Sequence, residues 1–272
     1  MDRRKYPATD QIAHTSLRGK TDITQFTEGV TRRIAVPLAD LLRKPNGARE
    51  RQLWLGEAFT VIDHDQGHAF GFAKKDGYCG WLPDAALTDA SEPTHWVATP
   101  GTHLYPEPRV QAREHAALPM GACLQVIANR GNFVETTVGF VPAAHMRQIG
   151  DWLTDPISVA ETFLGTPYLW GGNSRAGIDC SGLAQISFHA CGIAVPGDAD
   201  QQEVVGTALE ASTQLRRGDL LFWDGHIAMI VDAARLIHAN GHSMSVAYEP
   251  IDACIARIIA QNGGPVTQRR RP

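Results

Sequence analysis

A glycine-rich stretch that runs into a helical pattern at a cysteine constrains this chain more than any other feature. Three glycines between positions 171 and 177 interrupt regular structure, so residues 168–179 are expected to form a tight loop. Apolar residues at 183, 186 and 190 predict a half-buried helix that ends near Gly192. Cys180 therefore lies at a loop-to-helix junction, where free N–H groups favour a thiolate. Such a cysteine is either a nucleophile or a small buried apolar residue.

Two histidines downstream are expected to share one face of a sheet. The sequence predicts short strands at residues 218–223, 226–231 and 235–239, the first two joined by an Asp-Gly turn. If residues 232–234 form the second loop, Ala228 lies opposite His238, and His226 and His238 point to the same face. A two-residue loop would instead place the two histidines on opposite faces. A lone histidine on a strand is more often incidental than two histidines on one face with a cysteine at an upstream helix start.

The order and spacing of four short motifs resemble the NlpC-type cell-wall peptidases, which are papain-like cysteine endopeptidases of bacteria. The motifs are Asp-Cys-Ser-Gly-Leu from 179, Gly-Asp-Leu from 218, Gly-His-Ile-Ala from 225 and Ile-His-Ala from 237. The resemblance covers about residues 152–262. It implies that Cys180 is the nucleophile, His226 the base and His238 the orienting group. It also implies that the hydroxyl of Tyr168 helps to hold the oxyanion.

One pattern of short strands occurs twice before the cysteine. Gly80-Trp-Leu-Pro and Gly139-Phe-Val-Pro occupy equivalent closing positions, which indicates an internal duplication. Both copies resemble bacterial SH3-like domains. We therefore expect an α+β fold in which two small SH3-like β-barrels precede a papain-like NlpC-type catalytic domain. The expected divisions are an N-terminal arm at 1–29, SH3-like domains at 30–90 and 91–149, the peptidase domain at 150–263 and a basic disordered tail at 264–272.

Two further helices are expected in the peptidase domain. Asp155 is a candidate N-cap, Pro156 suits the first helical position, and Gly165 would end this helix. The second helix is expected over residues 199–209.

Composition and charge bear on the partners and the compartment. The 272 residues carry a formal net charge of −4, which gives no reason to expect nucleic acid or an anionic membrane as a partner. No apolar run is long enough to span a bilayer, and no signal peptide is visible. The five cysteines are odd in number and form no CxxC pair, which argues for a reducing compartment. The sequence therefore favours a cytoplasmic protein.

No metal site or cofactor is expected. His238 and His242 are four positions apart, but an Asn-Gly turn separates them. The HExxH pattern of helical zinc sites does not occur in the sequence.

Two SH3-like domains ahead of an NlpC-type domain are similar to the murein-recycling γ-D-glutamyl-L-diamino-acid endopeptidases, the dipeptidyl-peptidase VI type. This likeness implies cleavage after L-Ala-γ-D-Glu in murein stem peptides whose N-terminal alanine is free. It also implies that the first SH3-like domain walls off the substrate groove. The alternatives are a papain-like amidase or transacylase, or a non-catalytic peptidoglycan-fragment binder that would need no nucleophile. The sequence does not choose between diaminopimelate and lysine as third residue, and it does not give the oligomeric state.

Three substrate-binding residues are implied around the N-terminal alanine of the peptide. Glu57 and Tyr78 match a glutamate and a tyrosine on the first SH3-like domain of the family. A solvated turn carboxylate and a core aromatic are the respective alternatives. Asp179 raises the pKa of the adjoining thiol, so its presence makes sense if the alanine ammonium neutralises it.

Two more substrate-binding residues follow from the same resemblance. Ser181 either hydrogen-bonds the substrate or caps the helix. Asp198 matches a loop aspartate near the substrate. Gly197 and Ala199 flank it where the family often has arginine and serine, which leaves the detailed specificity open.

Overall fold

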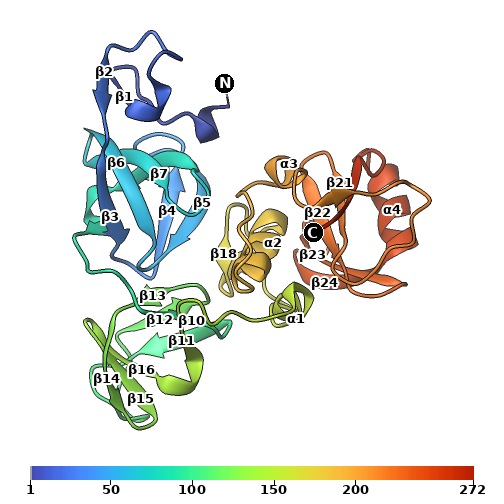
Figure 1. Ribbon diagram of the computed structural model, residues 1–272. Coiled ribbons are helices and arrows are strands. Elements are labelled where there is room, and N and C mark those ends of the chain that lie inside the picture. The colour runs from blue at the N-terminus through green and yellow to red at the C-terminus, as the bar shows by residue number, and fades with distance from the viewer. Residues whose placement is uncertain (1) are drawn as a thin grey trace. The chain divides into compact units, whose positions relative to one another are not determined.

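The computed structural model describes residues 2–272, which form two compact units divided between Ile149 and Gly150 (Figure 1). The first unit is built from strands and short 3-10 helices. The second unit combines a six-stranded sheet with α-helices. Among the described residues, no helix is both long enough and apolar enough to cross a bilayer.

An ordered arm precedes the first barrel. Its elements are η1 (Arg3–Lys5), β1 (Ile12–His14), η2 (Thr15–Leu17) and β2 (Gln25–Thr27), and β1 pairs with β2 in parallel. The hydroxyl of Thr9 donates to Asp63 at 2.6 Å, and the ring of His14 packs edge-on against Phe72. These contacts attach the arm to the barrel that follows.

The first barrel is a curled seven-stranded sheet. Its elements are β3 (Val30–Ile34), β4 (Leu38–Leu42), β5 (Arg49–Trp54), β6 (Ala58–Asp65), β7 (His68–Ala73), β8 (Cys79–Pro83), η3 (Asp84–Ala86) and β9 (Leu87–Thr88). The strand order is β5-β4-β8-β7-β6-β3-β9. Alternate side chains such as Leu41, Phe59 and Leu82 are buried inside the barrel, as the period of a strand requires.

The second barrel repeats the pairing of the first. Its elements are β10 (His95–Val97), β11 (Gly101–Leu104), β12 (Ala116–Pro119), β13 (Cys123–Leu124), β14 (Val126–Arg130), β15 (Phe133–Thr136), β16 (Gly139–Pro142), η4 (Ala143–His145) and β17 (Met146–Gln148). The pairs β11–β12, β14–β15–β16 and β10–β17 correspond to β4–β5, β6–β7–β8 and β3–β9. Both β8 and β16 end in proline and lead into a 3-10 helix and a short strand. The two closing segments singled out from the sequence therefore occupy the same place in each barrel.

The second unit packs two helices around a cysteine loop and against a sheet. Its elements are α1 (Pro156–Glu161), β18 (Asn173–Ser174), β19 (Gly177–Ile178), α2 (Cys180–His189), α3 (Ala199–Gln202), β20 (Thr207–Ala208), β21 (Leu220–Trp223), β22 (His226–Ile230), β23 (Arg235–Asn240), β24 (Ser245–Pro250), α4 (Ile251–Ala260) and β25 (Gln268–Arg271). The sheet order is β20-β25-β21-β22-β23-β24. As predicted, Asp155 caps α1 and Pro156 opens it.

Helix α2 is buried along nearly its whole length, so the prediction of a half-buried helix is wrong. Residues 180–188 are all buried, because α1 packs on one side of α2 while β22 and β23 pack on the other. The serines and the glutamine of this helix made it resemble an amphipathic surface helix. Gln185 instead donates to the carbonyl of Val195, which satisfies its amide inside the unit.

The strands β22 and β23, which carry His226 and His238, pair in the register that a three-residue loop requires. Trp223 lies opposite His226, which confirms the two-residue Asp-Gly turn. Ile230 lies opposite Leu236, so residues 232–234 form the second loop. The side chain of Asp232 accepts from two backbone N–H groups of this loop and fixes its shape.

Two predictions for the part of the chain after Asp198 are wrong. The helix expected over residues 199–209 is limited to α3, which ends at Gln202. A helix could not continue through Gly206, which adopts a positive φ and lies against the backbone of Arg271, where a Cβ would collide. The tail at 264–272, expected to be disordered, contributes β25, which pairs with β20 and β21. Its basic side chains find partners: Arg269 donates to the carbonyl of Ala211, and Arg271 to the buried carboxylate of Asp219.

Candidate active site

The loop before α2 is clamped to the helix by one carboxylate. Asp179 is the N-cap of α2, and its Oδ1 accepts from the backbone N–H of Gly182 at 2.6 Å and from the hydroxyl of Ser181 at 3.1 Å. Its Oδ2 accepts from the backbone N–H of Gly171 at 2.8 Å. The side chain of Ser181 thus supports the cap and is not itself the cap. The expectation that Asp179 needs a substrate cation is wrong, because this carboxylate already has three donors within the loop and helix.

Cys180, the first residue of α2, is 8% exposed and lies beside the start of β22. Its Sγ is 4.0 Å from the carbonyl oxygen of Gly225, and the backbone N–H of Ile227 also faces the sulfur. Burial and the charge of Asp179 raise the pKa of the thiol to about 12, and they outweigh the N–H groups at the helix start. The prediction of a lowered cysteine pKa is therefore wrong. This raised pKa favours the protonated thiol.

The two histidines form a direct hydrogen-bonded pair. Nε2 of His226 lies 2.8 Å from Nδ1 of His238, and the rings meet edge to face. Burial lowers the pKa of His226 to about 3 and that of His238 to about 4, so both rings are neutral near pH 7. His226 lies between the two residues that approach the sulfur of Cys180 through their backbones. Cys180 at the start of α2 and His226 at the start of β22 are therefore neighbours in this unit.

Tyr168 is held close to the cysteine by its backbone. Its N–H donates to the carbonyl of Met244 at 2.9 Å, and it forms a parallel bridge with Ile178. Burial, together with the nearby Cys180 and Asp179, raises the pKa of the phenol, so its hydroxyl keeps a proton to donate.

An ion pair behind His238 was missed by the sequence analysis. Nε2 of His238 lies 3.2 Å from Oε2 of Glu249 on β24. Arg257 on α4 binds both oxygens of this carboxylate, with Nε at 2.8 Å from Oε1 and Nη2 at 2.7 Å from Oε2. This ion pair lowers the pKa of Glu249 to about 2. Extending the predicted register across the next hairpin, where Leu236 lies opposite Glu249, would have placed the glutamate diagonal to His238.

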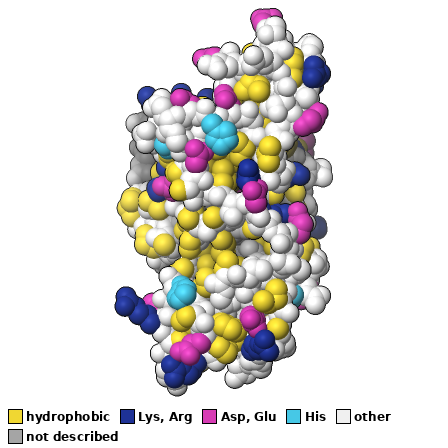
Figure 2. Space-filling view, turned by 90° about the vertical axis from the view of Figure 1, so that its left-hand side faces the viewer, with side chains coloured by type: hydrophobic (Ala, Val, Ile, Leu, Met, Phe, Trp, Pro, Cys, Tyr) yellow, Lys and Arg dark blue, Asp and Glu magenta, His cyan; other side chains and the backbone are white. Residues whose placement is uncertain are grey.

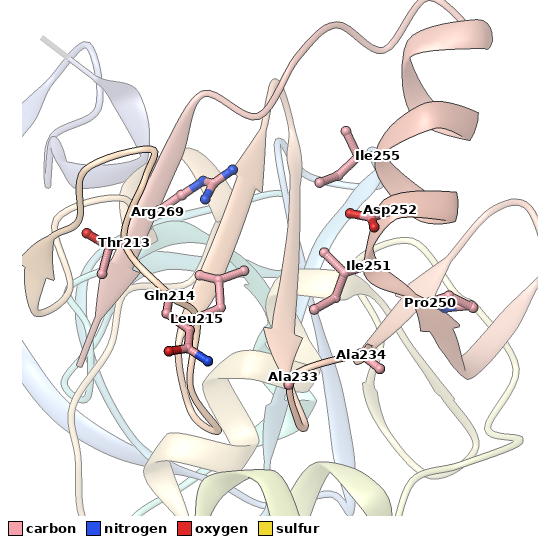
Figure 3. A pocket seen from close by; sticks show the side chains of 10 residues that line it. All are labelled: Thr213, Gln214, Leu215, Ala233, Ala234, Pro250, Ile251, Asp252, Ile255 and Arg269. Carbon is pink, nitrogen blue, oxygen red and sulfur yellow. The ribbon is translucent and has the colours of Figure 1, made fainter.

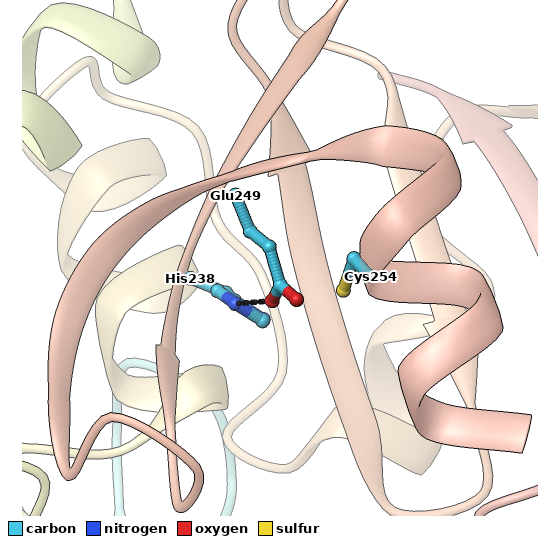
Figure 4. A group of neighbouring side chains, drawn as sticks. All are labelled: His238, Glu249 and Cys254. Atoms are coloured by element: carbon cyan, nitrogen blue, oxygen red, sulfur yellow. Dashed lines mark hydrogen bonds and ion pairs between the residues drawn. The ribbon is translucent and has the colours of Figure 1, made fainter. Parts of the chain in front are cut away.

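His238, Glu249 and Cys254 form a cluster that resembles a metal-ligand set (Figure 4). Their potential ligand atoms all lie within 4.8 Å of one another, and nitrogen, sulfur and oxygen ligands are those that zinc prefers. The guanidinium of Arg257 already binds both carboxylate oxygens and lies 3.7 Å from the sulfur. A divalent cation here would stand beside a fixed positive charge. The donor set therefore fits a hydrogen-bonded ion pair better than a metal site.

Glu57 and Tyr78, the substrate-binding residues expected on the first barrel, are both buried in their own unit. The carboxylate of Glu57 pairs with Lys75 at 2.7 Å and accepts from the backbone N–H of Trp54, while burial raises its pKa. Its Oε2 is buried and has no hydrogen-bond partner among the described residues. The alternative of a solvated turn carboxylate is therefore wrong. Tyr78 is 2% exposed, belongs to the barrel core and stacks under the guanidinium of Arg51.

Asp198, the last of the expected substrate-binding residues, is half-buried at the start of α3. Its carbonyl accepts from the N–H of Gln202, and its side chain does not cap the helix. The amide of Gln202 donates in turn to the carbonyls of Ser181 and Pro196. Asp198 is thus placed in the same unit as Cys180, one helix away along the chain.

Two of the cavities lined by described residues lie in the second unit. One, of about 440 Å³, is lined by His226, Trp223, Asn240, His242 and Arg257 among others. The other, of about 550 Å³, lies where β25 faces α4, with Arg269 on one side and Asp252 and Ile255 on the other (Figure 3). Its lining contains neither Cys180 nor either histidine of the pair, so the first of these two cavities is the one that adjoins the site.

The surface carries mixed charge. On the face shown in Figure 2, acidic and basic side chains are interspersed, and apolar side chains gather across its middle. This pattern agrees with the small net charge of −4.

Comparison with known proteins gives two family matches and a structural match. Residues 165–257 match the NlpC/P60 family, and residues 41–87 match the bacterial dipeptidyl-peptidase SH3 domain. Relatives from Bacillus cereus and Bacillus subtilis are both named gamma-D-glutamyl-L-lysine dipeptidyl-peptidase. The first is 27% identical and aligns over 75% of this chain and 71% of its own length. The second is 28% identical over 64% of each chain, so this chain spans just under two thirds of that relative.

A solved NlpC/P60 family protein from Bacillus cereus has the same fold. It superposes with a TM-score of 0.77 at 22% identity, and the match covers 89% of this chain and 99% of that one. The comparisons confirm the predicted resemblance and the α+β fold class.

Proposed function

Since residues 165–257 form an NlpC/P60 cysteine peptidase domain and residues 41–87 a bacterial dipeptidyl-peptidase SH3 domain, we propose that this chain hydrolyses the γ-D-glutamyl-L-diamino-acid bond of murein stem peptides. The observation that carries the proposal is the buried cysteine at the start of α2, beside the hydrogen-bonded pair of His226 and His238. The two Bacillus relatives, named for this bond with lysine as the third residue, support the substrate class.

The geometry supports a general-base mechanism that starts from neutral partners. Nε2 of His226 is engaged by His238, so Nδ1 is the ring nitrogen that accepts the thiol proton of Cys180. The sulfur attacks the γ-carbonyl carbon, and the hydroxyl of Tyr168 donates to the resulting oxyanion. The imidazolium then returns the proton to the leaving amine of the diamino acid. Water, activated by the same imidazole, hydrolyses the thioester and regenerates the thiol.

Recognition of a free N-terminal alanine is assigned to Glu57 and Tyr78 of the first barrel. The unpartnered, buried Oε2 of Glu57 supports an ammonium ligand, because a buried carboxylate oxygen without a donor is costly. Ser181 and Asp198 remain proposed substrate-binding residues, with no part of the peptide assigned to either.

The proposed place of work is the cytoplasm, where the protein would recycle released murein peptides. The five cysteines, the nucleophile among them, are all unpaired thiols, which suits a reducing compartment.

Peptide hydrolysis tests the proposed function directly. Incubation with L-Ala-γ-D-Glu-L-Lys should release L-Ala-γ-D-Glu, detected by mass spectrometry, and the diaminopimelate peptide shows which third residue is preferred. Cys180→Ala should abolish turnover, whereas Cys191→Ala, beyond the end of α2, should retain it. The N-acetylated peptide should be cleaved about 100-fold more slowly or worse, since the ammonium contact is lost.

Two results would count against the proposal. Turnover by Cys180→Ala at the wild-type rate would remove the nucleophile assignment. Equal cleavage of the free and acetylated peptides would show that the alanine ammonium is not recognised.

A further inference from the structure

The carboxylate of Glu249 is surrounded by hydrogen-bond donors. It lies against Nε2 of His238, against Nε and Nη2 of Arg257, and against the thiol of Cys254, which donates to it. Arg257 is held in turn by Gln261, whose Oε1 accepts from Nη1 at 3.0 Å. The ion pair is therefore fixed between β24 and α4, directly behind the histidine pair.

The chemistry of these groups decides which ring nitrogens carry protons. An ionised carboxylate can only accept hydrogen bonds, so Nε2 of His238 must carry the proton that Glu249 accepts. A neutral imidazole then has an acceptor at Nδ1, which faces Nε2 of His226 at 2.8 Å. Nε2 of His226 must donate, and Nδ1 of His226 is left without a proton. This is the tautomer that can accept the proton of Cys180.

We propose that Glu249, held by Arg257, is a positioning residue that sets the tautomers of both histidines and so leaves Nδ1 of His226 free to act as the base. The proposal rests on the proposed function, because it concerns the same Cys180 and His226. The sequence indicates three residues, Cys180, His226 and His238. The proposal adds Glu249 and Arg257, which lie further from the thiol.

Arg257 is as necessary as Glu249 in this arrangement. A lone carboxylate beside His238 would favour the doubly protonated ring. That ring would donate from Nδ1 and force His226 to accept at Nε2, which places the remaining proton of His226 on Nδ1. Burial, together with the guanidinium that neutralises the carboxylate, keeps His238 in its neutral form, in agreement with the lowered pKa of His238.

The test combines a spectroscopic measurement with kinetics. In protein labelled with ¹⁵N-histidine, long-range ¹⁵N–¹H correlations near pH 7 should show His226 and His238 both protonated at Nε2 and unprotonated at Nδ1. Glu249→Leu, which removes the acceptor at similar volume, should lose the fixed tautomer of His238. It should also lower kcat by about 10–100-fold, as expected when an orienting partner is removed, with little change in KM.

Two further variants separate positioning from folding. Glu249→Gln keeps one acceptor oxygen and should retain more of the tautomer signal and of kcat than Glu249→Leu. Glu161→Gln is the matched control, because Glu161 bonds Arg217 and Tyr248 in the same unit and does not contact the histidines. Its spectrum and kcat should match the wild type.

The outcomes are decisive in either direction. A wild-type spectrum with His238 protonated at Nδ1 overturns the proposal, and so does a folded Glu249→Leu protein with unchanged tautomers and kcat. If Glu249→Leu does not fold, the wild-type spectrum and Glu249→Gln decide. The spectrum needs no turnover, so a wild-type protein that fails to cleave the tripeptide counts against the proposed function and leaves the tautomer assignment to be read independently.

Discussion

The pKa values of the proposed catalytic residues, Cys180 and His226, are shifted toward their uncharged forms. Burial raises the pKa of Cys180 and lowers that of His226, so a thiolate–imidazolium pair is disfavoured before substrate binds. Many activated cysteines are instead thiolates at rest, next to a positive charge. Here the nearest charge is the carboxylate of Asp179, which acts in the opposite direction. Proton transfer to His226 and attack on the substrate are therefore expected to occur together.

The lowered pKa of His226 makes a prediction about the pH dependence of the rate. The base works only when neutral, and a histidine with a lowered pKa stays neutral as the pH falls below its ordinary value of 6.5. The acid limb of kcat/KM should therefore lie well below pH 6.5. Arg257→Gln removes one cause of the lowered pKa values of His226 and His238, so its limb should move to higher pH.

Rates between about pH 3 and about pH 8 measure this limb. Arg235→Gln, at an exposed ion pair on the same unit, should follow the wild-type profile. A wild-type limb at or above pH 6.5 would contradict the neutral resting state.

At the scale of elements, one carboxylate links a loop to a helix and tunes the nucleophile. Asp179 caps α2 through Gly182 and holds the glycine loop through Gly171. Its charge is also the second cause of the raised pKa of Cys180. The same side chain therefore stabilises the site and reduces the acidity of its thiol.

Asp179→Asn should separate these two effects. The amide oxygen can still cap α2, but the amide nitrogen cannot accept from Gly171, so the free energy of unfolding should fall by about 1 kcal/mol. Loss of the negative charge should lower the pKa of Cys180. Alkylation of Cys180 by iodoacetamide across a pH series, with Cys191→Ala as background, should therefore begin at lower pH than in the wild type. An unchanged alkylation profile would show that Asp179 does not influence the thiol.

Elements whose geometry depends on neighbouring residues in the sequence could be predicted from the sequence. Elements whose geometry depends on contacts with distant residues could not. The Asp-Gly turn and the three-residue loop fixed the register of the histidine strands, because turn length decides which residues face each other. The burial of α2 and the early end of α3 depend on packing partners far along the chain. The same holds for Glu249, which becomes a neighbour of His238 only when β24 pairs with β23.

At the scale of the molecule, the catalytic sheet depends on its last strand. β25 lies between β20 and β21, and Arg271 binds Asp219, whose side chain is 1% exposed. The NlpC/P60 match ends at residue 257 and does not include this strand. The run of arginines suggested a solvated tail. Composition alone does not show that these side chains pair with a buried carboxylate and with backbone carbonyl groups.

Arg271→Ala should lower the midpoint of thermal unfolding more than Arg235→Ala does. Arg271 faces a buried carboxylate, which would be left with only a backbone donor, whereas Arg235 and Asp232 form an exposed i,i+3 pair. Scanning calorimetry of the two variants measures the difference. Equal midpoints would show that β25 contributes little to the second unit.

The position of β25 also orders events during synthesis. Arg271 is 52 positions after Asp219, so one edge of β21 has no partner until residues 268–271 have been synthesised. An unpaired strand edge on a nascent chain can pair with other chains. The second unit is therefore expected to be most prone to aggregation in the interval between synthesis of β24 and synthesis of β25.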